Sequence, residues 1–199
     1  MQDFFSADTL AFIAAHQDDD VAKLALKFSS HKDIDIRAAL QQIEGRQIAK
    51  SKLPSFANVE NIVYPVKLSM EQCSSEKTAL YKQSVAGDGA SMIDLTSGFG
   101  IDFYFISRHF KKAEYVERNA DLCRIASHNF KSLGATNVSA TNADGIELIK
   151  ASTSHYDLIF LDPARRDKNG KKTVEIKDCE PDVAALKETL LSKCDRMML

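Results

Sequence analysis

The spacing of apolar residues divides the chain into an N-terminal part with a helical period and a longer part in which short apolar runs alternate with helical patterns. In the first part, apolar side chains recur every three or four positions: Val21, Leu24 and Phe28, then Ile36, Leu40 and Ile43. This period marks one face of a helix. We therefore expect an N-terminal helical domain over residues 1–52, with Gly45 and Pro54 marking the end of its helical region.

A connector is expected over residues 53–74, because Pro54 and Pro65 each disfavour helix at the preceding residue. The pair Ser69 and Gln72 has the spacing of a capping box, which predicts a helix that begins at Ser69. A further helix is predicted from Glu76 to Val85, directly before the first strand.

Residues 75–199 alternate between strand and helix patterns. Short apolar strands are predicted at 91–95, 113–117, 138–141, 156–162 and 196–199. Helices are predicted from residue 101, over 120–134, after 145 and from 181. This alternation predicts an α/β fold with a parallel sheet covered on both faces.

Residues 91–102 hold the most informative motif, an apolar strand that ends near Asp94 and runs into a Gly-x-Gly turn. Gly98 and Gly100 allow a tight turn and a close approach of the backbone to a ligand. A helix that starts at Ile101 would point its free N–H groups at that ligand. The motif predicts a nucleotide-cofactor loop, although an ordinary strand–helix turn has the same glycines.

Two acidic residues at the ends of later strands strengthen this interpretation. Glu117 lies 23 positions after Asp94, which is the distance at which doubly wound folds place the acid that holds ribose hydroxyls. Asp162 and Pro163 follow four consecutive apolar residues, as expected of a buried parallel strand that delivers an acid to its carboxyl end.

The motif order Asp94-x-x-x-Gly98-x-Gly100, Glu117, Asn142-Ala143-Asp144 and Asp162-Pro163 resembles class I S-adenosylmethionine-dependent methyltransferases over about residues 75–199. More narrowly, the glycine loop, the Asp-Pro-Ala-Arg-Arg run and the segments at Gln42 and Glu71 resemble a bacterial group that carries a THUMP-like domain. That group is similar in its cofactor loop to the cap trimethylguanosine synthases. The resemblance implies a Rossmann-like sheet with two more strands, followed by the THUMP-like domain, so we expect this chain to be a truncated form that lacks the last strands.

The resemblance implies S-adenosylmethionine as cofactor. Asp94 would accept from its ammonium group, Glu117 from both ribose hydroxyls and Asp144 from the adenine amino group. The predicted cofactor-binding residues are Asp94, Thr96, Ser97, Gly98, Phe99, Gly100, Asp102, Glu117, Arg118, Ala143, Asp144, Gly145 and Asp162. For each acid the alternative is a carboxylate that caps a helix or forms a turn.

The predicted catalytic residues are Asp162, Pro163 and Arg165. They occupy the place where amino-group methyltransferases carry Asp/Asn-Pro-Pro-Tyr/Phe, and this chain departs from that pattern at Ala164 and Arg165. An arginine plane can stack on a base or hold a phosphate. Methylation of a pyrimidine carbon would need a cysteine nucleophile, and Cys179 has no evident activating base. The acceptor atom therefore stays open.

Charge suggests RNA as the substrate. The net charge of −2 excludes a basic field over the whole protein, but residues 163–177 carry six basic residues against two acids. Such a segment beside an active site can hold phosphates. Alternatively, this basic segment is an ordinary solvated surface loop.

No apolar run is long enough to span a bilayer, and the first five residues lack the basic start and apolar core of a signal peptide, so a cytoplasmic protein without membrane contact is expected. The scattered cysteines and histidines predict no metal site. The oligomeric state cannot be inferred from the sequence.

Two other functions share the motifs. A noncatalytic RNA-binding module could keep the cofactor fold, and the basic segment 45–52 favours it. A nicotinamide-dependent oxidoreductase would share the glycine turn and Glu117. However, the third glycine of Gly-x-Gly-x-x-Gly is missing, and Asp94 would crowd a pyrophosphate.

Overall fold

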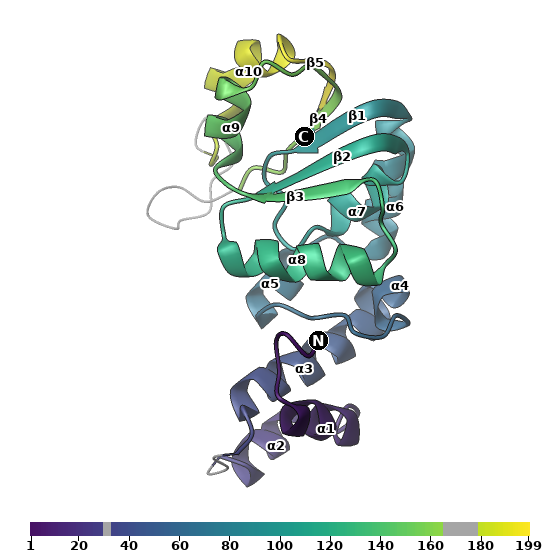
Figure 1. Ribbon diagram of the computed structural model, residues 1–199, viewed down its shortest axis with the longest axis vertical. Coiled ribbons are helices and arrows are strands. Elements are labelled where there is room, and N and C mark those ends of the chain that lie inside the picture. Colours follow the sequence, from purple (N-terminus) through teal and green to yellow (C-terminus); the bar gives the residue numbers. More distant parts are fainter. Residues whose placement is uncertain (30–32, 165–178) are drawn as a thin grey trace.

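The computed structural model describes residues 1–29, 33–164 and 179–199, which contain a five-stranded parallel sheet and, below it in Figure 1, a helical N-terminal part. The strand order is β3-β2-β1-β4-β5. The strands are β1 (Gly89–Asp94), β2 (Phe110–Glu117), β3 (Val138–Asn142), β4 (Tyr156–Phe160) and β5 (Cys194–Met198). The helices are α1 (Ala7–Ala15), α2 (Val21–Lys27), α3 (Ile36–Lys52), α4 (Pro54–Ala57), α5 (Lys67–Gln72), α6 (Glu76–Ala86), α7 (Ile101–Ser107), α8 (Ala120–Ser132), α9 (Gly145–Ala151) and α10 (Val183–Leu191).

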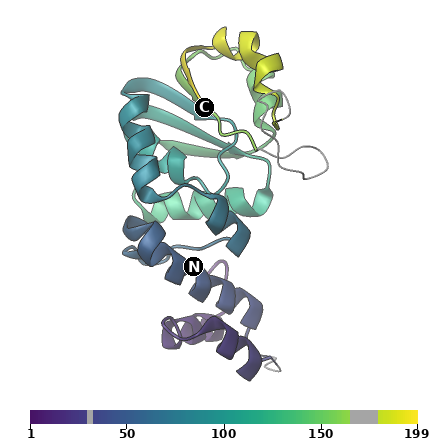
Figure 2. The same ribbon diagram turned by 180° about the vertical axis from the view of Figure 1, so that it is seen from behind.

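The sheet is buried on both faces at its centre, because β1 and β4 alternate apolar side chains between two cores. Met92 of β1 and Leu158 of β4 pack against α6, α7 and α8. Their neighbours Ile93 and Ile159 point the other way and pack against α9 and α10. Figures 1 and 2 show these two helical layers on opposite sides of the sheet. The predicted α/β fold with a parallel, doubly covered sheet is confirmed.

The N-terminal helices bury a separate small core. Phe12 and Ile13 of α1, Leu24 of α2 and Ile43 of α3 are in contact there, so the predicted helical periodicity of this region is confirmed. Asp20 and Asp35 cap α2 and α3 by accepting from backbone N–H groups. Whether residues 1–52 form a domain that folds alone stays a prediction.

The expected end of helix at Gly45 is wrong, because Gly45 lies in the middle of α3. A β-carbon at this position would lie 2.3 Å from Cβ of Tyr64. Glycine at this position therefore allows the connector to pack closely against α3, and it does not end the helix. Gln42 supports this approach, since its side chain accepts from the N–H of Tyr64 and donates to its carbonyl oxygen.

The sequence predicts the connector as an extended chain, and this prediction is wrong. The connector contains the short helices α4 and α5, and α5 begins at Lys67 instead of at a Ser69 cap. The chain between them is tied to α8 by the buried Asn129, which accepts from the Val63 N–H and donates to the Val63 carbonyl oxygen. The side chain of Asn129 thus makes the two backbone hydrogen bonds that a neighbouring strand would otherwise make with Val63.

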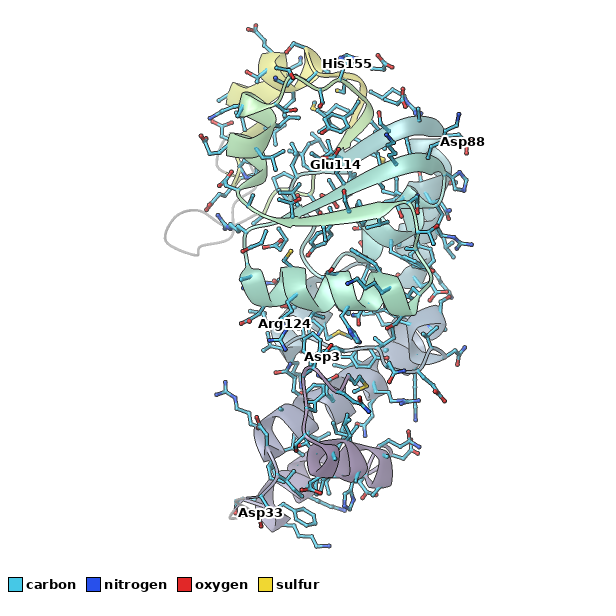
Figure 3. The ribbon with its side chains drawn as sticks, in the orientation of Figure 1. Asp3, Asp33, Asp88, Glu114, Arg124 and His155 are labelled. Carbon is cyan, nitrogen blue, oxygen red and sulfur yellow. The ribbon has the colours of Figure 1, made fainter. Side chains whose placement is uncertain are left out.

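The first residues of the chain lie against the outer side of α8. Arg124 stacks over the Phe4 ring with its guanidinium carbon 4.1 Å from the ring centroid, and it donates to the Asp3 carbonyl oxygen. Figure 3 shows Asp3 and Arg124 together at this junction, with Asp33 far away at the tip of the N-terminal helices. The contact links the helical part to the sheet part of the chain.

No helix within the described ranges is long and apolar enough to cross a membrane. Among those same residues, no three His, Cys, Asp or Glu side chains form a group that could hold a metal ion. Location in the cytoplasm stays a prediction.

We predict that Gly45→Ala destabilises the protein although alanine favours helix by roughly 1 kcal/mol over glycine. The new methyl group would collide with Tyr64 next to its backbone, and overpacking of this kind costs about 1 to 3 kcal/mol. The free energy of unfolding from chemical denaturation measures the effect. Ser51→Ala at an exposed position of α3 is the control, and a Gly45→Ala variant as stable as the parent would contradict the close approach.

Candidate functional site

A cavity of about 860 Å³ opens at the carboxyl ends of β1, β2 and β4. This is the edge of an open α/β sheet at which ligands bind. Of the predicted cofactor-binding residues, every one except Ala143 lines the cavity, as do Asp162 and Pro163. Ala143 instead packs into the core beneath α9 and α10. Arg165, predicted as catalytic, lies outside the described residues.

The glycine loop between β1 and α7 is held in place by β2. Gly98 and Gly100 have φ angles of 55° and 83°, which residues with a side chain rarely adopt. The Tyr115 hydroxyl donates to the Gly98 carbonyl oxygen over 2.5 Å, and Oε2 of Glu117 accepts from the Gly98 N–H over 2.8 Å. Burial raises the pKa of Tyr115, which keeps its hydroxyl a donor.

Glu117 is nearly buried, with 9% of its surface exposed. Its Oε2 accepts from Gly98 and its Oε1 accepts from the Asn119 N–H over 2.7 Å. The turn-forming alternative for this acid is therefore observed. A carboxylate offers about four acceptor positions, so acceptor capacity remains for hydroxyl groups of a ligand in the cavity.

Asp94 lies at the end of β1 with 1% of its surface exposed. Its Oδ1 accepts from the Thr96 N–H over 3.0 Å. Burial raises the pKa of Asp94 to about 8, and the nearby carboxylates Asp102 and Asp162 act in the same direction. A cationic group beside Asp94 would favour its ionised form.

One end of the cavity borders on an ion pair that the sequence motifs do not reveal. Lys82 of α6 reaches Asp102 in the first turn of α7, with Nζ 2.6 Å from Oδ2. Ser74 donates to the same oxygen over 2.8 Å, whereas Oδ1 of Asp102 is buried with no hydrogen-bond partner among the described residues. No local pattern singles out Lys82, because only the packing of α6 against α7 brings it to Asp102.

Asp162 follows β4 and is the most accessible acid of this end, with 59% of its side chain exposed. Its backbone N–H donates to Oγ1 of Thr96 over 2.7 Å, which joins the β4 end to the glycine loop. Three further residues that the sequence analysis does not assign to the site line this end: Ser69, Gln72 and Cys73. They come from α5 and the residue after it, so the connector forms one wall.

The other end of the cavity is formed after β2 and β3. Asp144 caps α9, with Oδ1 accepting from the N–H groups of Ile146 and Glu147. The capping alternative is thus observed, and no described residue donates to Oδ2. Arg118 pairs with Glu180 over 2.6 Å, and both residues line the cavity.

The chain is similar in sequence and in structure to known proteins. It is 30% identical to a protein whose solved structure is named "putative methyltransferase from Porphyromonas gingivalis W83", with a TM-score of 0.74 over 97% of this chain and 48% of that one. A Mycoplasma mobile protein named as an uncharacterized RNA methyltransferase is 29% identical over 135 residues, which are 66% of this chain and 37% of the relative. The chain thus spans less than half the length of either relative.

In this chain the parallel strands carry the glycine loop after β1, acids at the ends of β1 and β2, and an acid after β4. Residues 75–188 match the family described as Conserved hypothetical protein 95. That match covers more than half of the chain. The chain therefore belongs to this family and has the Rossmann-like methyltransferase fold.

Proposed function

We propose that the protein is an S-adenosylmethionine-dependent methyltransferase, and that the cavity described above holds the cofactor. The observation that carries this proposal is the fixed glycine loop facing Glu117, with a buried Asp94 at the end of the first strand. Relatives named as methyltransferases support it. The narrower assignment to a group with a THUMP-like domain is part of the same proposal.

Each end of the cavity fits one part of the cofactor. Glu117 would accept from the ribose hydroxyls, and Oδ2 of Asp144 would accept from the adenine amino group. Asp94 would accept from the ammonium group of the amino-acid tail. When bound, the cofactor supplies a methyl group on a positively charged sulfur. The acids that gather around Asp94 suit that charge.

The acceptor would enter beside Asp162 and Pro163, in the accessible end of the cavity. Asp162 would orient the acceptor by accepting a hydrogen bond from it, and positioning supplies most of the catalysis of such a transfer. Thr96 holds the backbone of Asp162, so the loop that contacts the cofactor also places the acceptor.

RNA is the proposed substrate. The Mycoplasma mobile relative is named as an RNA methyltransferase, and the basic run that begins at Arg165 follows Asp162 in the sequence. A noncatalytic RNA-binding module has less support, because two lysines of segment 45–52 are used within the chain. Lys50 pairs with Asp18, and Lys52 donates to the carbonyl oxygens of Met70 and Glu71.

We predict that Glu117→Gln weakens binding of S-adenosylhomocysteine roughly tenfold or more, because an amide loses one acceptor oxygen. Calorimetry measures the affinity. Since Glu117 also holds Gly98, the loss must be smaller for a 2′,3′-dideoxy analogue of the same ligand. An equal loss for both ligands would show that Glu117 acts on the loop alone.

We predict that binding of S-adenosylhomocysteine at pH 7 releases a proton. The pKa of Asp94 near 8 leaves its carboxyl largely protonated in the free protein, and the ligand's ammonium favours the carboxylate. Affinity should therefore rise between about pH 6 and 8. Calorimetry in two buffers of different ionisation enthalpy measures the release. Asp94→Asn should abolish it, and equal heats for the parent in both buffers would refute the assignment.

We predict that Asp162→Ala in the whole protein keeps its affinity for S-adenosylhomocysteine but loses turnover, on the order of 100-fold or more, because the interaction of Asp162 with the acceptor belongs to the transition state. The assay transfers labelled methyl from the cofactor to total RNA from cells that lack the gene. Protein and small-molecule extracts serve as comparison. Label in protein but not in RNA would reject RNA as the substrate, and undiminished turnover would reject Asp162 as catalytic.

A further inference from the structure

Lys82 is a fixed charge beside the candidate site, where it contacts two acids that line the cavity, Asp102 and Asp162. Its Nζ lies 2.6 Å from Oδ2 of Asp102, 3.2 Å from Oγ of Ser74 and 3.8 Å from Oδ2 of Asp162. The side chain is only 19% exposed, and Nζ also lies 5.4 Å from the centre of the Phe160 ring. These contacts keep the ammonium group from turning into solvent, where its field would be screened.

The charges around Lys82 are predominantly acidic. Asp94, Asp102 and Asp162 influence one another electrostatically. Within residues 1–29, 33–164 and 179–199, Lys82 is the only cation that forms an ion pair with any of these three acids. Arg118, at the opposite end of the cavity, is paired with Glu180. Among the described residues, the positive charge at this end of the cavity therefore comes from Lys82.

The proposed methyl donor would bring its positive sulfur close to this lysine. Reacting atoms approach to about 3–3.5 Å before transfer, and an acceptor oriented by Asp162 lies about 3 Å from its carboxylate. Nζ of Lys82 is 3.8 Å from the same carboxylate. The methyl carbon and the ammonium group thus come within about 10 Å of each other, and the sulfur lies one bond beyond the carbon, a range over which charges in a partly buried site interact measurably.

We infer that Lys82 is a specificity-determining residue, an inference that rests on the proposed function. Lys82 limits how strongly the site prefers the cationic donor, S-adenosylmethionine, over the product, S-adenosylhomocysteine, whose sulfur is uncharged. The charge of Lys82 opposes the attraction of Asp102 and Asp162 for the positive sulfur. As the methyl group leaves, that positive charge disappears from the sulfur. An uncompensated acidic wall would stabilise the bound donor more than the transition state, which slows transfer.

The test measures the affinities of S-adenosylmethionine and S-adenosylhomocysteine by calorimetry and compares their ratio between variants. Lys82→Met should shift the ratio severalfold toward S-adenosylmethionine. Lys82→Arg keeps the charge and should leave the ratio near that of the parent. Lys77→Met is the matched control, since Lys77 is an exposed lysine of α6, and it should leave both affinities unchanged.

The ratio separates an electrostatic role from a structural one, because a distorted site weakens both ligands alike. An unchanged ratio in Lys82→Met, or an equal loss for both ligands, overturns the inference. Asp162→Asn removes a negative charge at an exposed position and should shift the ratio the other way. It provides the decisive variant if Lys82→Met does not fold, and an unchanged ratio in it also overturns the inference. Binding of neither ligand by the parent rejects the proposed function itself, and this inference with it.

Discussion

Gly98 is bound to β2 through both of its backbone polar groups, and the geometry of the candidate site depends on this attachment. Tyr115 donates to the carbonyl oxygen and Glu117 accepts from the N–H. Because residues two positions apart in a strand point to the same face, Tyr115 and Glu117 both reach the loop from one face of β2. The loop is therefore preorganised, and a ligand would spend little binding free energy in ordering it.

The connector between α3 and α6 owes its path to buried polar side chains rather than to secondary structure. Gln42 and Asn129 satisfy the backbone groups of Tyr64 and Val63. Their bonds hold the chain over α8, and the next helix, α5, then forms a wall of the cavity. Unpaired buried backbone groups are costly, so these two amides position one wall of the site from a distance.

Electrostatics gives the two ends of the cavity different characters. At one end Asp94 is buried and Asp102 has one unpartnered oxygen among the described contacts, with Lys82 opposing their charge. At the other end, Asp144 serves a helix N-terminus and Arg118 is paired at the surface. Surface ion pairs contribute little to stability, whereas partly buried charges such as Lys82 retain much of their field. The electrostatic proposals therefore concern the first end.

The sequence by itself determined the strands, the glycine turn and the acids that follow β1, β2 and β4. These features are local, and parallel strands bring their carboxyl ends to one edge. Tertiary packing decided the rest. Gly45 lies inside α3 because Tyr64 packs on it. Ala143 packs against the core although the next residue, Asp144, lines the cavity, and Lys82 meets Asp102 only where α6 lies against α7. Contacts between distant segments leave no periodic signal in a chain, since their partners are set by how the helices pack.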